Sequence, residues 1–219
     1  MDQPLLLLQD LSWRGFARPG EGLLSPPLTW AIASGERWAV VGPEGCGKST
    51  LLRLMAGLLP PDGGEIRLAG QPLAQVTNRA AIMGVLFADP ASRFLTPVVW
   101  EEVALTPTLF GVTGEVLQQR VAEALQEAGL PAGLASRELA TLSMAESARV
   151  ALAAVWVMQP RLLLWDEPGR DLSEAGEEAL ARQLKGKSLA SVVFTSRMAR
   201  AERFAGRVLQ WEAGGWRFL

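Results

Sequence analysis

A glycine-rich stretch at residues 42–50 constrains this 219-residue chain more than any other feature. It reads Gly42-Pro43-Glu44-Gly45-Cys46-Gly47-Lys48-Ser49-Thr50. This stretch fits the pattern G-x-x-x-x-G-K-[ST], and it lies between an apolar segment ending at Val41 and a helical segment expected over 48–58. Glycines let successive N–H groups point at one phosphate, and the start of the helix adds the positive end of its dipole. We therefore predict that residues 42–50 cradle the phosphates of ATP, with Lys48 at the β- and γ-phosphates and Ser49 on Mg²⁺.

A second apolar segment, residues 162–168, ends in two acidic residues, Asp166 and Glu167. A buried strand that finishes in this way places both carboxylates at the carboxyl edge of a sheet, where α/β folds bind their ligands. Asp166 suits the coordination shell of Mg²⁺. Glu167 is then placed to orient or deprotonate an attacking water, so we predict it as the catalytic carboxylate.

The rest of the chain alternates between two patterns. Short strands are expected at residues 5–8, 28–32, 37–41, 65–68 and 81–87. Helical periodicity dominates from about 98 to 158, and a strand–helix alternation returns from 161 to 211. Strand–helix alternation on both sides of a helical block predicts an α/β fold, with a parallel-sheet core and an inserted helical subdomain.

Composition excludes several kinds of protein. The net charge is −2, which gives no basic surface for nucleic acid, and the single cysteine excludes an internal disulfide. The chain has no histidine, so it supplies no imidazole to any reaction. Its longest apolar run, 150–158, falls short of the roughly 20 residues of a membrane span, and no signal peptide is expected. These observations predict a cytoplasmic protein, or one held at a membrane by partners.

The two motifs and the helical block between them resemble the ATP-binding-cassette (ABC) family over nearly the whole chain. Residues 84–90 and 97–107 look most like its energy-coupling-factor subgroup, whose ATPases drive vitamin and transition-metal uptake. The resemblance implies a single domain, 1–219, of P-loop NTPase fold: a RecA-like core, an antiparallel β subdomain and a helical subdomain at about 98–158. It also implies integral membrane transporter subunits as partners, a location on the inner face of the cell membrane, and a head-to-tail dimer with itself or a paralogue.

The same resemblance suggests further contacts to the nucleotide. An aromatic residue near the amino terminus stacks on adenine in this family, and Trp13 or Phe16 could do so here, although either could belong to the core instead. Ser143, Met144, Ala145 and Glu146 correspond to the signature loop that faces the partner's nucleotide.

Four positions depart from the family's pattern. Ala88 replaces a glutamine, Ser173 replaces an aspartate, and Ser196 replaces the histidine that follows the last core strand. In the signature loop, side chains at 144 and 145 replace two glycines and block close backbone approach. Glu146 sets a negative charge near a partner's γ-phosphate, which is unfavourable where it is uncompensated. We therefore expect near-normal ATP binding and slow hydrolysis.

Two other functions remain open. A degenerate subunit that binds ATP, hydrolyses it poorly and regulates a partner ATPase would have the same fold. A P-loop kinase is disfavoured because kinases need a lid and an acceptor pocket, and a GTPase is disfavoured because no N/T-K-x-D motif accompanies the few lysines. Four arginines near the carboxyl terminus, at 197, 200, 203 and 207, are expected to form a solvated helix face; contact with acidic headgroups or a membrane subunit is the alternative.

Overall fold

The structure is a computed structural model that describes residues 3–14, 24–88, 94–170, 172–212 and 214–219. It divides into two compact units. Unit one comprises Met1–Met83, Arg161–Pro168 and Ser188–Leu219, and unit two comprises Gly84–Pro160 and Gly169–Lys187. Each unit is described by itself.

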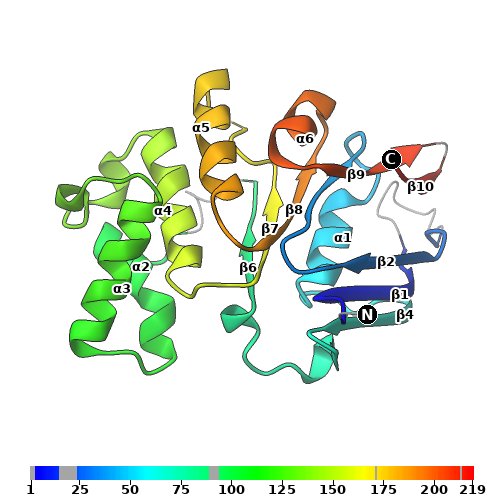
Figure 1. Ribbon diagram of the computed structural model, residues 1–219, viewed down its shortest axis with the longest axis horizontal. Coiled ribbons are helices and arrows are strands. Elements are labelled where there is room, and N and C mark those ends of the chain that lie inside the picture. Colours follow the sequence, from blue (N-terminus) through cyan, green and yellow to red (C-terminus); the bar gives the residue numbers. More distant parts are fainter. Residues whose placement is uncertain (1–2, 15–23, 89–93, 171, 213) are drawn as a thin grey trace. The chain divides into compact units, whose positions relative to one another are not determined.

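Unit one contains a sheet with strands in the order β10-β9-β3-β8-β7 (Figure 1). The bounds are β3 Arg37–Val41, β7 Leu162–Asp166, β8 Ala190–Thr195, β9 Arg207–Glu212 and β10 Gly215–Phe218. The pairs β3–β8, β3–β9 and β7–β8 are parallel, and β10 runs antiparallel to β9. Helix α1 (Lys48–Met55) packs on β7 and β8, and α6 (Met198–Phe204) packs on β3 and β8. Every residue of β8 is buried, as expected for a central parallel strand.

A second, antiparallel sheet in unit one has the order β2-β1-β4-β5. Its strands are β1 Leu6–Ser12, β2 Leu28–Ile32, β4 Gly63–Leu68 and β5 Gln71–Pro72. Alternate residues of β2 are buried, which is the pattern of a sheet with one covered face. The pairing of β1 shifts register between Leu8 and Leu11. The α/β fold with an antiparallel β subdomain that the sequence predicts is confirmed.

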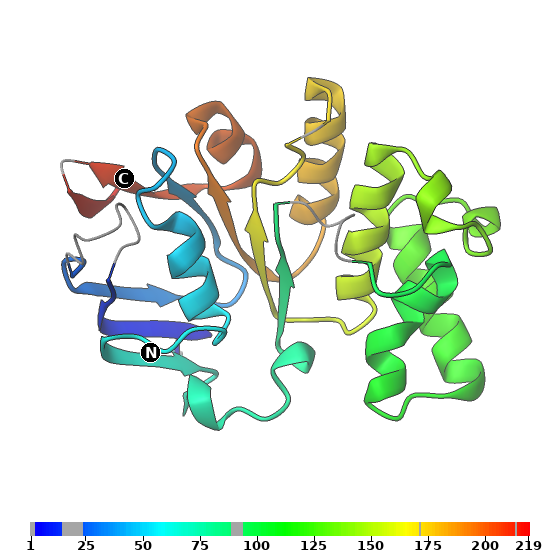
Figure 2. The ribbon, with the colours of Figure 1, turned by 180° about the vertical axis from the view of Figure 1, so that it is seen from behind.

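Unit two is built mainly from helices (Figure 2). They are α2 Val99–Leu109, α3 Gly114–Glu127, α4 Met144–Trp156 and α5 Glu174–Lys185. Strand β6 (Met83–Leu86) begins at the last residue of the first segment of unit one. Short 3₁₀ turns cover Leu73–Gln75 and Arg79–Ala81 in unit one, and Ala132–Leu134 and Leu139–Thr141 in unit two.

Helices α2, α3 and α4 pack against one another and fall within the segment 98–158 that the sequence assigns to a helical subdomain. Val103, Val121 and Val150 fill the space between them and are each at most 1% exposed. Within the described residues, no helix combines the length and the apolar character needed to cross a membrane.

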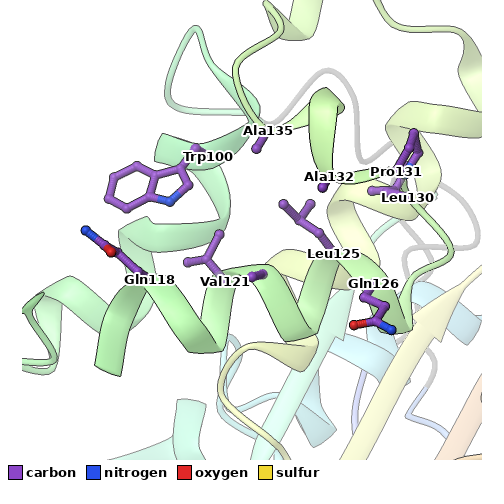
Figure 3. Close-up of a pocket in the computed structure, with 10 residues that line it drawn as sticks. Trp100, Gln118, Val121, Leu125, Gln126, Leu130, Pro131, Ala132 and Ala135 are labelled. Carbon is purple, nitrogen blue, oxygen red and sulfur yellow. The ribbon is translucent and has the colours of Figure 1, made fainter. Parts of the chain in front are cut away.

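Unit two also contains a cavity of about 460 Å³ (Figure 3). Trp100, Val121, Leu125 and Leu130 form much of its wall, and none of its ten lining residues is charged. A nucleotide carries several negative charges, which bind to cations and N–H donors. This cavity therefore does not match a triphosphate, and the candidate site lies in unit one.

Candidate active site

The phosphate loop follows strand β3 and leads into helix α1 of unit one. Gly47 is the N-cap of α1 with φ of 96°, a left-handed conformation that glycine adopts without strain. No side chain caps this helix. Its first N–H groups are therefore open to an anion, and the dipole favours negative charge there. At Gly42, a Cβ atom would lie 2.6 Å from Sγ of Cys46 and 2.9 Å from Cβ of Trp211, so the fold itself requires glycine.

Lys48 occupies the centre of the loop. Its side chain is 7% exposed, and Nζ donates to the carbonyl oxygens of Gly42 at 2.6 Å and Pro43 at 2.8 Å. Two neutral carbonyls thus hold the ammonium group in a partly desolvated position. This is the arrangement expected of a cation that binds the β- and γ-phosphates.

The other loop residues differ in exposure. Pro43, Glu44 and Gly45 are exposed, whereas Thr50 is buried at 8%. Burial raises the pKa of the Cys46 thiol, although the nearby Lys48 ammonium opposes this shift. Because the thiolate is the reactive form, Cys46 is a packed loop residue rather than an activated nucleophile.

Ser49 and Asp166 meet although 117 positions separate them in sequence. Oγ of Ser49 donates to Oδ2 of Asp166 at 3.3 Å, which brings together two oxygen atoms of the kind that Mg²⁺ prefers. Among the described residues, no group of three or more acidic or cysteine side chains could hold a metal alone. The pair therefore fits a Mg²⁺ ion whose remaining ligands are phosphate oxygens and water.

The pKa of Asp166 is raised, first by burial and then by the negative charge of Glu167, while Ser49, Lys48 and Arg53 oppose the shift. A raised folded-state pKa means that the ionised carboxylate destabilises the ligand-free protein at neutral pH, and that this cost fades as the pH falls through the raised pKa. A bound cation would offset the cost.

We expect Asp166→Asn to raise the Tm of the protein in EDTA at pH 7.5, and the gain to shrink in acidic buffer. The same variant should lose the extra stabilisation that Mg²⁺ adds to bound ATP, because the amide is a poorer metal ligand. Melting curves with and without Mg-ATP measure both effects, with Glu178→Gln as an exposed control. A variant that melts below the wild type in EDTA would contradict the sign.

Glu167 is held by several contacts at the carboxyl end of β7. Its φ of 45° is a left-handed value that a residue with a side chain adopts only under strain, and such strain gathers at functional sites. Oε1 accepts from the N–H of Ser196 at 2.8 Å, and Oε2 accepts from Oγ1 of Thr195 at 3.0 Å. Nη1 of Arg200 also donates to Oε2, at 2.5 Å.

The position of Arg200 corrects the sequence analysis. Its side chain is only 3% exposed, so the solvated arginine face that the sequence predicts does not include it. Arg197, the N-cap residue just before the same short helix, is exposed as expected. Because a cation in the interior needs a partner, the buried Arg200 is paired with the candidate catalytic carboxylate. No signal in the sequence links Arg200 to Glu167.

The structure argues against Trp13 as the residue that stacks on adenine. Trp13 is 3% exposed, and its ring centroid lies 6.4 Å from that of Trp216 in strand β10. A ring covered in this way offers no open face to a base. The cover comes from the C-terminal hairpin, which the sequence does not predict. The alternative candidate, Phe16, lies outside the described residues.

The signature-loop residues begin helix α4 of unit two. Ser143 is the N-cap and forms a capping box with Glu146. Oε2 of Glu146 accepts from both N–H and Oγ of Ser143 at 2.8 Å, and Oε1 accepts from Arg137 at 3.2 Å. The bonds from Ser143 and the charge of Arg137 lower the pKa of Glu146. Hydrogen bonds from Ser143 and the charge of Arg137 therefore compensate the negative charge of Glu146, which the sequence analysis treats as uncompensated.

The remaining signature residues and departures are mostly exposed. Met144 is 52% exposed and Ala145 is half-buried. Ser173 is the N-cap of α5, where its Oγ accepts from the N–H of Gly176 at 3.3 Å, and Ser196 is exposed. Ala88 lies just after β6 and is half-buried.

Comparisons with known proteins identify the family of this chain. A family model described as ABC transporter matches residues 26–170. The chain is 42% identical over 160 residues to a Gloeobacter violaceus protein described as an ABC transporter ATP-binding protein, covering 72% of this chain and 66% of that protein. It is 33% identical over 221 aligned positions to the energy-coupling factor transporter ATP-binding protein EcfA2 of Methanospirillum hungatei, covering 97% and 54%. The chain thus spans between half and two thirds of these relatives' length.

Solved structures resemble the fold closely. The cbiO1 protein of Clostridium perfringens, described as part of the ABC transporter complex cbiONQ, matches with a TM-score of 0.86 and 23% identity, over 99% of this chain and 88% of that one. The dimeric ATP-binding cassette MJ0796, bound to ADP and Pi, matches with a TM-score of 0.83 and 24% identity, over 98% and 97%. Because both identities are below 25%, these similarities support the fold alone.

Proposed function

The chain belongs to the family of ABC transporter ATP-binding proteins, and from this membership we propose that it binds Mg-ATP in unit one and hydrolyses it to drive solute uptake through a membrane partner. The observation that carries the proposal is the convergence of the phosphate loop with the carboxyl end of β7. Lys48 is buried at the centre of the loop, and Ser49 meets Asp166. These groups suit the two needs of ATP, which are a cation for the phosphates and oxygen ligands for Mg²⁺.

In this proposal residues 42–50 hold the phosphates, and Ser49 and Asp166 hold the metal. The metal would neutralise charge that develops on the phosphate oxygens during transfer. Glu167 orients the attacking water and accepts its proton. Oε1 of Glu167 accepts one described hydrogen bond, from the N–H of Ser196, and a carboxylate oxygen has lone pairs for two. A second acceptor position on Oε1 is thus available to water.

The subgroup and partners follow from the relatives. EcfA2 is named as an energy-coupling factor transporter protein and cbiO1 as part of a transporter complex, so we propose an importer of this kind. The subunit would lie on the cytoplasmic face of the membrane, bound to integral membrane subunits. It would pair with a second ATPase subunit, as MJ0796 does in its dimeric structure.

A second candidate function is a nucleotide-binding subunit that hydrolyses ATP poorly and regulates a partner ATPase. The capping box favours it, because Oγ of Ser143 already donates to Glu146 at 2.8 Å. A hydroxyl engaged in its own helix cap is less available to a partner's γ-phosphate. The exposed Met144 and the absence of histidine from the chain also point this way.

Steady-state hydrolysis and equilibrium ATP binding by the purified chain test these functions together. The importer ATPase predicts ATP binding together with turnover that stops in EDTA and resumes with Mg²⁺. Binding without turnover, alone and after mixing with a paralogous subunit, would favour the regulatory function. Absence of ATP binding would contradict both.

A further inference from the structure

The contacts around Glu167 point to a role for Arg200 that rests on the proposed function. A carboxylate at a strand end is aimed only if neighbouring groups fix its rotamer, because a free glutamate side chain samples several. In the ABC family a histidine follows the strand that corresponds to β8, and in this chain Ser196 stands there without charge. The cation near Glu167 comes instead from α6, four positions further along the chain.

The geometry of the pair is suited to positioning. Nη1 of Arg200 donates to Oε2 at 2.5 Å, with side-chain exposures of 3% for Arg200 and 14% for Glu167. Oγ1 of Thr195 donates to the same oxygen at 3.0 Å. Within the part of the chain that the structure describes, Oε2 thus accepts two bonds, while Oε1 accepts one, from Ser196. The side chain is held through Oε2, and Oε1 keeps acceptor capacity for water.

We propose that Arg200 is a positioning residue that fixes the Glu167 carboxylate for hydrolysis in a cassette that lacks histidine. It does so through the charged hydrogen bond from Nη1 to Oε2, in a buried place where such a bond is strong. Arg200 acts through Glu167 and has no contact with the nucleotide in this proposal. Its removal changes the turnover number and leaves ATP affinity unaltered.

The test combines kinetics with a structure of the variant. Arg200→Met keeps the length and packing of the side chain and removes the guanidinium. We expect kcat to fall about 10- to 100-fold, the range typical for outer-shell partners, with the Kd for ATP within twofold. Arg200→Lys should restore part of the loss, because it returns a cation. Arg197→Met removes an exposed charge from the N-cap position of the same helix and should leave kcat unchanged.

Two outcomes in kinetics would overturn the proposal. One is an Arg200→Met variant with wild-type kcat. The other is an equal fall in kcat when the substitution is made in a Glu167→Gln background, since a residue that acts through the carboxylate has no effect once the carboxylate is gone. We expect less than a twofold change there.

A crystal structure of Arg200→Met decides the matter independently of turnover. We expect the Glu167 carboxylate to leave the N–H of Ser196, and a carboxylate that stays 2.8 Å from it would overturn the positioning role. A wild type that binds ATP without hydrolysing it would refute the proposed ATPase. The crystal structure would still show whether Arg200 holds the carboxylate.

Discussion

Replacing Glu167 with Gln is expected to lower ATP turnover by about 10²–10⁴-fold and to change ATP binding by less than about twofold. The fall corresponds to the contribution of one positioned acid–base group. Binding is expected to survive because the groups proposed to hold Mg-ATP, including Lys48 and Asp166, are left intact. Steady-state turnover and equilibrium titration with ATP, both with Mg²⁺, measure the two quantities.

The same substitution should also lower thermal stability in this protein. Removing one partner of a buried ion pair typically costs about 3–5 kcal/mol. The amide of Gln still accepts hydrogen bonds and the site is 14% exposed, so we expect a smaller loss of about 1–3 kcal/mol. We attribute this loss in the free energy of unfolding to the broken ion pair with Arg200.

Glu202→Gln is the matched control, because it removes an exposed carboxylate from helix α6. It should leave turnover and Tm unchanged. A Glu167→Gln variant that hydrolyses ATP at the wild-type rate would show that another group activates the water. A Glu167→Gln variant with the wild-type Tm would show that the buried Arg200 does not need the negative charge of Glu167 for the stability of the fold.

The bounds of two strands of unit one, β2 and β3, are predicted correctly from the sequence. The expected bounds of 28–32 and 37–41 are those of β2 and β3, because apolar alternation or continuous burial marks them. The motif at 42–50 and the acids at 166 and 167 could be placed because strand ends fix where they lie. Local pattern and tertiary structure agree at these positions.

The C-terminal hairpin and the packing of Trp13 could not be predicted in the same way. Strand β10 is short, and its residues are half-buried or exposed, so no clear alternation marks it. Its pairing with β9 nevertheless brings Trp216 to within 4.9 Å of Trp211, between ring centroids, and over Trp13. The burial of Trp13 matches the alternative that the sequence left open, a residue of the core, because a distant strand covers its ring.

Arg200 shows a different limit of sequence reasoning. With Arg197 and Arg203 it follows a three-residue spacing, which is typical of one solvated helix face. The packing of α6 on β3 and β8 buries the middle member, and the chain reversal at β8 brings it to Glu167, 33 positions earlier in sequence. Only the tertiary structure distinguishes this arginine from its neighbours.

The second large effect is expected for Lys48→Ala, which should weaken ATP binding about 10- to 150-fold. A hydrogen bond to a charged group contributes about 1.5–3 kcal/mol, and each 1.4 kcal/mol is a factor of ten in Kd. Nζ of Lys48 already lies within the loop, held by the carbonyls of Gly42 and Pro43, so little reorganisation is needed to meet a phosphate. Titration with ATP in the presence of Mg²⁺ measures the change.

Lys185→Ala is the matched control, because it removes a lysine from the exposed last turn of α5 and should leave ATP affinity as it is. The melting temperature of Lys48→Ala in the absence of nucleotide shows whether the loop still folds. Loss of the ammonium leaves two carbonyls without this donor, which lowers stability only if water does not replace it. A folded Lys48→Ala protein that binds ATP as tightly as the wild type would place the triphosphate outside the loop at 42–50, and the roles proposed for Ser49, Asp166 and Glu167 would then fall with it.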